Sequence, residues 1–435
     1  MRLIRLLKND MAREAAEWVD EEIISESQAE KICERYGADY HQSKSHVFGY
    51  NVLIGLGYLF LGLALIILLG ANWDEIPRAV RMWGLIALTM AVQGLALRQY
   101  LSDNRSGAAS LFFLGNFFYG ASIILIAQVY HLGEHMPDGI FWWALGCLPI
   151  GLLINNAWVT LQSALLAVIW FLVEVNMGFY PALMPLFIIG SLIVLYRSER
   201  SIMLFLTVVV SIGLWVEYTL ATLWRDGRHF DFSAEHVVVT VSLFILAYLF
   251  SHWLASKQSS VAKDYGSVLA VWSLRFGLII MAVMSFEDPW QELITAEWRH
   301  VSDMLIIVAV CLSLSLWLAY RTKKLVPAGA ISAFFIIALI VVLVVEDHGV
   351  ALYLQVLSNI VLVTVGIWLV VRGIHGGISH YFFLGVASIL VTAFMRYIDL
   401  IGDYIGGAML FLVLAAVLLG AAKYWKRHQA REVLS

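Results

Sequence analysis

The stretch VPAGAISAFFIIALIVVLVV, residues 326–345, decides the fold of this chain. It runs for twenty residues without a charged side chain. A bilayer core about 30 Å thick requires roughly 17–25 apolar residues per helix, so this stretch is long enough to cross a membrane. The whole chain has the same bias, because 61% of its 435 residues are hydrophobic and 14% are charged. The sequence therefore predicts an integral membrane protein.

Segments of this kind recur along the chain, and about fourteen of them can be marked as membrane spans. The sequence therefore predicts an all-α fold, a polytopic integral membrane helix bundle, in which the fourth and sixth spans are short. Because the number is even, both termini are expected on the same side of the membrane. The predicted spans are residues 50–70, 79–98, 108–130, 140–154, 157–175, 181–196, 202–222, 236–255, 266–286, 301–320, 326–345, 351–371, 377–398 and 404–424.

The lysines and arginines are distributed unevenly between the two sides of this arrangement. With the N-terminus inside the cell, 21 of the 28 fall in cytoplasmic segments, six fall outside and one, Arg275, falls within a span. Cytoplasmic loops of membrane proteins carry the excess of positive charge. Both termini are therefore predicted to be cytoplasmic.

Residues 1–47 are expected to form a separate cytosolic helical hairpin. Apolar residues recur at helical spacing in AREAAEWVDEEIIS, residues 12–25, and Ser25 is followed three residues later by Gln28, as in a capping box. After this hairpin we expect an N-terminal transmembrane bundle at 48–200 and a C-terminal transmembrane bundle at 201–425. A cytosolic basic tail follows at 426–435.

Three segments resemble a bacterial family of predicted polytopic membrane proteins that is catalogued only as a domain of unknown function. They are EEIISESQAEKICERYG in the hairpin, GANWDEIPRAVRMW at residues 70–83, and IAQVYHLGEHMPDGIFWWALGCLPIGLL at residues 126–153. In the first segment, Glu22 stands where the family pattern has a glycine. The similarity covers about the first third of the chain. The segment FMRYIDLIGDY, residues 394–404, also resembles related proteins, but it is less specific.

This resemblance implies a multi-pass protein of the bacterial inner (cytoplasmic) membrane without an established activity. It also implies that other small membrane proteins are partners of the chain in a complex. The lipid bilayer is the partner that the composition itself predicts. Nucleic acid is not an expected partner, because the formal net charge is -4 and no basic cluster interleaved with aromatic residues is present.

The residues His131, Glu134 and His135 spell H-x-x-E-H, the motif of inverted zinc peptidases. Those enzymes place both histidines on one face of a continuous helix. Here Gly133 lies between the histidines and Pro137 follows, so a helix is expected to end inside the motif. We therefore predict neither a metal nor another cofactor, and we interpret the stretch as a loop at the outer interface.

Arg275 is predicted to lie near the middle of the bilayer, nine residues into its span. An arginine at this depth costs a few kcal/mol on insertion scales, so it usually faces the bundle interior and has a partner. Glu217 and Glu174 are the expected partners. The arrangement is either an ion pair that holds helices together or a site for substrate binding and coupling.

Other candidate residues lie within the spans and at their outer ends. Asn116 and Gln128 are twelve residues apart on nearly the same helical face, and His131 follows them, so they either line a cavity or form interhelical hydrogen bonds. Aromatic, acidic and arginine side chains at the outer helix ends form either a recognition surface or the interfacial belt. This outer-face cluster contains Trp73, Asp74, Arg396, Asp399 and Asp403.

Three functions are compatible with these patterns. The first is a secondary transporter or permease-like protein for a small solute, favoured by the many spans, Arg275 and the acidic outer face. Because phosphate-binding loops are absent, such transport would depend on a gradient or on partner proteins. The second is a membrane scaffold or subunit of an envelope-assembly complex. The third, an intramembrane enzyme acting on a lipid-linked substrate at the outer face, ranks last, and no catalytic residue is assigned.

Overall fold

The computed structural model describes residues 14–15, 18–19, 21, 23–36, 40, 56–57, 60, 77–130, 135–198, 200–225, 230, 232–345, 349–377, 379–399 and 412. Within these residues every regular element is a helix, which confirms the all-α class. The chain divides into two compact units, residues 45–232 and residues 1–44 together with 233–435. The helix after residue 200, Ile202–Leu223, packs against the helices before it in the first of these units. The predicted domain boundaries stay predictions.

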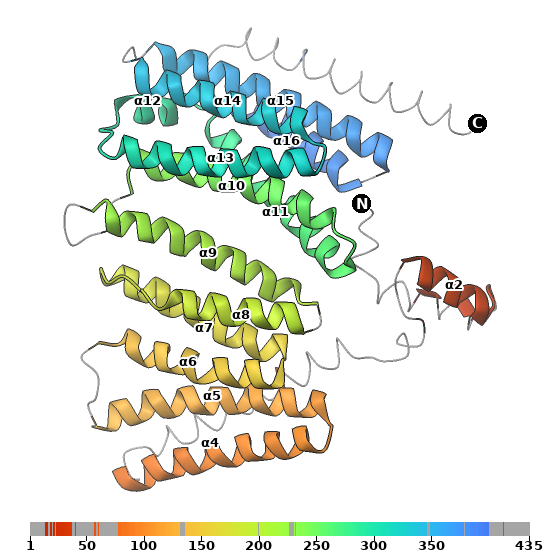
Figure 1. Ribbon diagram of the computed structural model, residues 1–435, viewed down its shortest axis with the longest axis vertical. Helices are drawn as coiled ribbons and strands as arrows, with labels where there is room; N and C mark the ends of the chain where they lie inside the picture. The colour runs from red at the N-terminus through yellow and green to blue at the C-terminus, as the bar shows by residue number, and fades with distance from the viewer. Residues whose placement is uncertain are drawn as a thin grey trace. The chain divides into compact units, whose positions relative to one another are not determined.

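The unit of residues 45–232 is a row of helices that pack mainly on their neighbours along the chain (Figure 1). The helix at its centre, α7, contacts α5, α6, α8 and α9 and has the most buried surface of the spans. The short connections between helices explain this order, since each helix turns back beside the one before it. The helices are α4 (Arg78–Leu101), α5 (Arg105–Tyr130), α6 (Pro137–Ile154), α7 (Ala157–Asn176), α8 (Met184–Arg197) and α9 (Ile202–Leu223).

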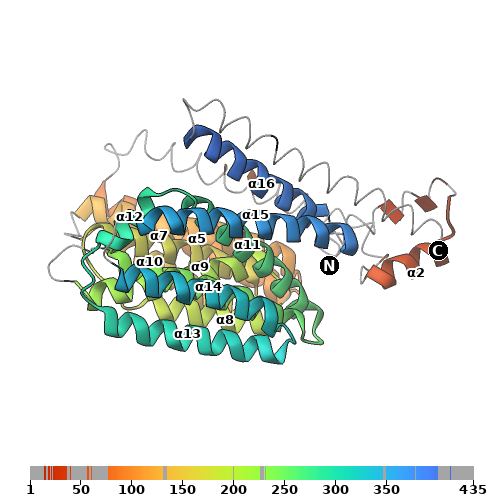
Figure 2. The ribbon, with the colours of Figure 1, turned by 90° about the horizontal axis from the view of Figure 1, so that it is seen from above.

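In the other unit, α10 packs against both α11 and α13, and α15 packs closely against α16 (Figure 2). The short helix α12 contacts α14 and α15. The helices are α2 (Glu26–Tyr36), α10 (Ala234–Ala255), α11 (Ser260–Val283), α12 (Asp288–Thr295), α13 (Val301–Arg321), α14 (Leu325–Val344), α15 (Val350–Gly376) and α16 (Ser379–Asp399).

Eleven of the described helices are long and apolar enough to cross a membrane, so the chain is a polytopic helical membrane protein. The predicted short span at 140–154 is part of α6, which has 18 residues, whereas the one at 181–196 is α8, which has only 14. The spans predicted at 50–70 and 404–424 lie outside the described residues. The total of about fourteen spans therefore stays a prediction.

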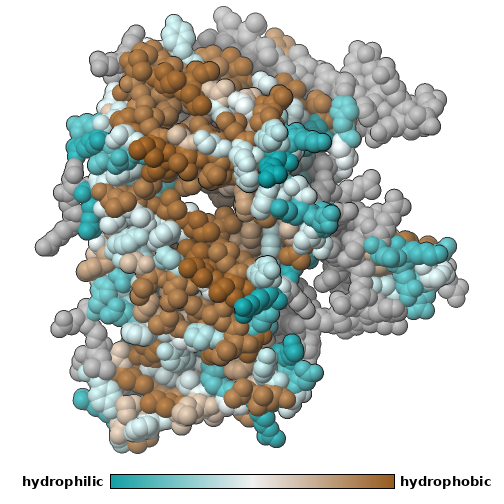
Figure 3. All heavy atoms as spheres, viewed as in Figure 1, coloured by the Kyte–Doolittle hydropathy of each residue, from teal (hydrophilic) through white to brown (hydrophobic). Residues whose placement is uncertain are grey.

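The helix ends and the helix middles differ in polarity, as a membrane requires. In the view of Figure 3, hydrophobic side chains gather over the middle of the helices and hydrophilic ones nearer the ends. The unit of residues 1–44 and 233–435 is called the C-terminal unit below. In it, three basic side chains lie over tryptophan rings near the C-terminal ends of α10, α13 and α15. Tryptophan prefers the membrane–water interface, so these pairs mark one such level. They are Lys257 over Trp253, Arg321 over Trp317 and Arg372 over Trp368.

The polar N-terminal segment contains the predicted cap. The Ser25 backbone N–H donates to Gln28 Oε1 over 2.9 Å, which is one of the two bonds of a capping box. Cys33 of α2 belongs to a small buried cluster that the earlier helical residues Trp18 and Val19 also contact. The separate cytosolic hairpin of residues 1–47 stays a prediction.

Small residues allow α15 and α16 to approach closely. A Cβ atom added to Gly385 of α16 would lie 2.5 Å from the carbonyl oxygen of Gly366 and 2.8 Å from the backbone nitrogen of Val370, both on α15. Helix pairs in membranes use such glycines because apolar side chains gain little by leaving lipid for a protein interface. This contact fixes the position of the last turn of α16, which carries Arg396.

Candidate functional site

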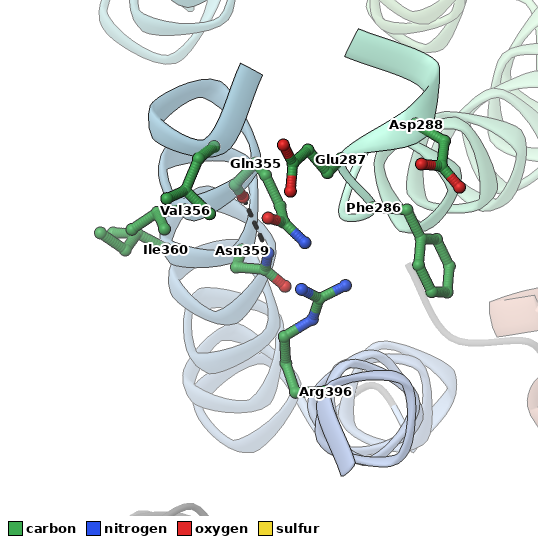
Figure 4. Close-up of a pocket in the computed structure, with 9 residues that line it drawn as sticks. Phe286, Glu287, Asp288, Gln355, Val356, Asn359, Ile360 and Arg396 are labelled. Atoms are coloured by element: carbon green, nitrogen blue, oxygen red, sulfur yellow. Dashed lines mark hydrogen bonds between the residues drawn. The ribbon is translucent and has the colours of Figure 1, made fainter. Parts of the chain in front are cut away.

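The C-terminal unit contains a pocket of about 590 Å³ between α15, α16 and the turn that joins α11 to α12. Figure 4 shows the Arg396 side chain extending from α16 toward the first turns of α15. Three kinds of side chain line the pocket, namely charged groups, amides and apolar groups. The lining residues are Phe286, Glu287, Asp288, Leu352, Gln355, Val356, Asn359, Ile360 and Arg396.

Arg396 of the predicted outer-face cluster lines this pocket, and it is the one member of that cluster whose side chain is described. Its guanidinium carbon lies 5.3 Å from the centre of the Phe286 ring, in the range of a cation–π contact. A guanidinium is planar and carries several N–H donors, a shape that suits a planar anion such as a carboxylate.

The amide residues of the pocket lie one helical turn apart on α15. The Asn359 amide donates to the backbone carbonyls of Gln355 and Ser285, over 2.7 and 3.1 Å. The bond to Ser285 connects α15 to the end of α11, so it fixes the wall from which Glu287 and Asp288 extend. Among the described residues, no hydrogen-bond partner is found for the buried Asn359 Oδ1, which leaves an acceptor at the pocket wall.

The acidic residues occupy the opposite side of the pocket from α16 (Figure 4). Glu287 lies just before α12 and accepts a hydrogen bond of 2.7 Å from Gln291, while Asp288 is the first residue of that helix and is exposed. One cation and two acids therefore line the same space. A small molecule with a negative group and a positive group matches this distribution better than a singly charged one.

In the unit of residues 45–232, called the N-terminal unit below, Asn116 lies at the centre of a chain of hydrogen bonds. Its side chain accepts from Gln93 of α4 over 3.1 Å and donates to Gln162 of α7 over 3.0 Å, while its backbone carbonyl accepts from Trp143 of α6 over 2.8 Å. Asn116 is fully buried. These bonds connect four helices, so the hydrogen-bonding alternative describes Asn116 well. Gln128 is exposed on α5 and is not part of this network.

Glu174 has partners within its own unit. Its Oε2 lies 2.9 Å from His135 Nε2 and its Oε1 accepts from Trp170 Nε1 over 3.0 Å. His135 is the last residue of the H-x-x-E-H stretch and lies two residues before the start of α6. These two residues, together with Asp138, are the group of described side chains that can hold a metal ion.

Arg275 does not line the pocket, and its side chain is exposed on α11. Its guanidinium carbon lies 5.4 Å from the centre of the Trp272 ring. Glu217 and Glu174 belong to the other compact unit. Pairing of Arg275 with either acid, and its role in coupling, stay predictions.

Several predicted site residues cannot be placed. Four of them lie outside the described residues, namely His131, Trp73, Asp74 and Asp403. The fifth, Asp399, is the last residue of α16, and its side chain is not described. The pocket residues Gln355, Asn359, Glu287 and Asp288 were not among the predicted site residues. The acids carried a signal, since both lie at the predicted outer end of a span, and Asn359 carried one as a polar residue within the predicted span 351–371.

Comparison with known proteins confirms the resemblance found in the sequence. The family described as "Predicted membrane protein (DUF2157)" matches residues 16–160, about a third of the chain. No curated protein and no solved structure matches the chain. The match includes the Asn116 network except Gln162, and it includes His135, but the pocket around Arg396 lies beyond it.

Proposed function

We propose that this chain is a secondary transporter, or a permease-like protein, for a small polar solute, and that the solute binds in the pocket around Arg396. The pocket itself is the observation that carries the proposal. Its volume of about 590 Å³ falls within the range of small-molecule sites. Eleven of the described helices are long and apolar enough to cross a membrane, and they would provide the scaffold across which a bound solute moves.

The predicted topology places this pocket on the outer side of the bacterial inner membrane, with both termini in the cytoplasm. It lies at the beginning of α15 and the end of α16, opposite the helix ends that carry Lys257, Arg321 and Arg372. Cytoplasmic ends carry the positive excess, which supports this orientation. A pocket on the outer side suits uptake of a solute from the periplasm.

The side chains favour a zwitterion as the solute. Arg396 is suited to a carboxylate or phosphate group, because a guanidinium donates two parallel hydrogen bonds to such anions. Glu287 and Asp288 are suited to an ammonium group on the other side of the pocket. The amides at Gln355 and Asn359 supply donors and acceptors for the polar groups between.

Ligand-induced thermal stabilisation of the purified full-length protein tests this proposal. A panel of small zwitterions, anions and cations is screened against the wild type, Arg396→Ala and Arg321→Ala. Arg321 also lies over an aromatic ring but at a distance from the pocket, so it is the matched control. We expect zwitterions to stabilise the wild type and Arg321→Ala, and not Arg396→Ala. Stabilisation by no compound, or equal stabilisation of all three proteins, would overturn the proposal.

A further inference from the structure

His135, Asp138 and Glu174 come together at one end of the N-terminal unit. Asn156 accepts hydrogen bonds from the backbone of Trp158 and Val159 and so caps α7 directly after α6 ends. The two helices therefore run antiparallel, and the start of α6 lies beside the end of α7. Each of the three residues offers a ligand atom within 4.8 Å of the other two.

The position of Glu174 is fixed by its surroundings. The residue is 8% exposed, and the indole N–H of Trp170, one turn earlier on α7, donates to its Oε1. The Trp170 ring in turn contacts the ring of Phe141, at 5.0 Å between centres. The other oxygen of Glu174 faces His135. An outer-shell hydrogen bond of this kind orients a metal-binding carboxylate in many proteins.

An aromatic ring also contacts the imidazole of His135. The centre of the Phe179 ring lies 4.7 Å from that of the imidazole in an edge-to-face arrangement. The Nε2 atom points at Glu174 over 2.9 Å. Asp138 lies in the first turn of α6 and is exposed, so its carboxylate is accessible to an ion from water. The site thus has two fixed ligands and one accessible ligand.

We infer that His135, Asp138 and Glu174 bind a divalent transition-metal ion, with Zn²⁺ as the best fit. One imidazole nitrogen and two carboxylate oxygens are ligands that zinc accepts at about 2.0–2.2 Å. Two ligands at this distance in tetrahedral geometry are about 3.3 Å apart, so the His135–Glu174 contact has to open by only a few tenths of an ångström. Two carboxylates also neutralise the charge of the ion.

This ligand set differs from the one that the H-x-x-E-H spelling suggests. The peptidase motif would use both of its histidines on one helix, but residues 131–134 of the motif lie outside the described residues. The inferred site takes His135 from the motif and Glu174 from 39 residues further along the chain. It needs no continuous helix, and it is separate from the pocket around Arg396, which lies in the other unit.

Zinc titration of the chelator-treated, full-length protein by calorimetry tests the inference. We expect one Zn²⁺ per chain, with affinity reduced about tenfold or more in His135→Ala and Glu174→Gln. Trp170→Phe keeps an aromatic ring but removes the N–H that orients Glu174, so we expect a loss of roughly 10–100-fold. His375→Ala replaces an exposed histidine of the other unit and should bind zinc like the wild type.

Asp138→Asn keeps the test decisive if the buried variants fail to fold, because Asp138 is exposed. A folded Asp138→Asn protein with weakened zinc binding supports the site. Binding by the wild type at no more than a trace stoichiometry would overturn the inference. Unchanged affinity in Asp138→Asn and in every folded variant of His135 or Glu174 would overturn it as well.

Discussion

The guanidinium carbon of Arg396 lies 5.3 Å from the centre of the Phe286 ring, and this contact joins the last turn of α16 to the turn between α11 and α12. The two residues come from distant parts of the chain, yet both line the same pocket. The pocket therefore depends on the packing of three separate segments. Substitutions at Arg396 and Phe286 therefore test whether these segments pack together as described.

Replacing either member of the Arg396–Phe286 pair should cost about 0.5–2 kcal/mol of unfolding free energy through the lost cation–π contact. The variants Arg396→Met and Phe286→Leu keep apolar volume but remove the charge or the ring. In a double-mutant cycle measured by denaturation in detergent, the second substitution should cost less than it does alone. Strictly additive effects would show that the contact contributes nothing.

The Asn116 network should stabilise the N-terminal unit. Asn116→Ala leaves the side chains of Gln93 and Gln162 without their shared partner, and an unsatisfied buried polar group costs about 1–3 kcal/mol. We expect a lower unfolding free energy by about that amount. Gln128→Ala on the same helix is the control, and it should change stability by less than about 0.5 kcal/mol because Gln128 is exposed. Equal effects of the two substitutions would rule out the structural role of the network.

The close approach of α15 and α16 makes Gly385 sensitive to substitution. In Gly385→Ala the new methyl group would meet the backbone of α15 at Gly366, and overpacking of this kind typically costs about 1–3 kcal/mol. Gly329→Ala on α14 adds a methyl group that meets nothing within 4 Å, so it should be neutral or stabilising. Thermal denaturation of both variants compares them, and a harmless Gly385→Ala would mean that the helices pack less closely.

The turn between α13 and α14 should give the protein a measurable pH dependence. Burial, and secondly the positive charge of Arg372, lower the pKa of Lys324 from 10.5 to about 8. Between these two pH values the unfolded chain binds more protons than the folded protein, so this residue makes stability rise with pH. Below about pH 8 the residue is charged in both states and its contribution no longer changes.

Lys324→Met removes this contribution. The stability difference between wild type and variant should therefore shift in favour of the wild type as the pH increases through the same window. Denaturation midpoints measured at a series of pH values give the comparison. Lys323→Met, at an exposed neighbour, controls for the loss of a lysine. A difference that is constant with pH would refute the shifted pKa.

The membrane spans were predictable because partition into a bilayer depends on a local run of apolar residues. Eleven predicted spans correspond to described helices of sufficient length. The bond between Ser25 and Gln28 was predictable for the same reason, since it joins residues three positions apart. Membrane spans and helix caps can therefore be predicted from sequence, because each depends on residues that are close together along the chain.

The partners of the polar residues were not predictable in this way. Glu174 meets His135 from 39 residues away, and neither residue carries a local signal for that contact. Glu235 in the first turn of α10 resembles an ordinary acid at a helix start, yet it is fully buried and accepts hydrogen bonds from the backbone of Arg299 and His300. Such contacts follow from helix packing, which a single sequence does not specify residue by residue.

Solute uptake into proteoliposomes tests the central claim most directly. A radiolabelled zwitterion that stabilises the protein is supplied outside vesicles with an imposed proton gradient, and uptake is compared for wild type, Arg396→Ala and Arg321→Ala. We predict gradient-dependent uptake by the wild type and by Arg321→Ala, and uptake by Arg396→Ala no greater than that of empty vesicles. Uptake by Arg396→Ala at the wild-type rate, or no uptake by the wild type above empty vesicles, would contradict the account.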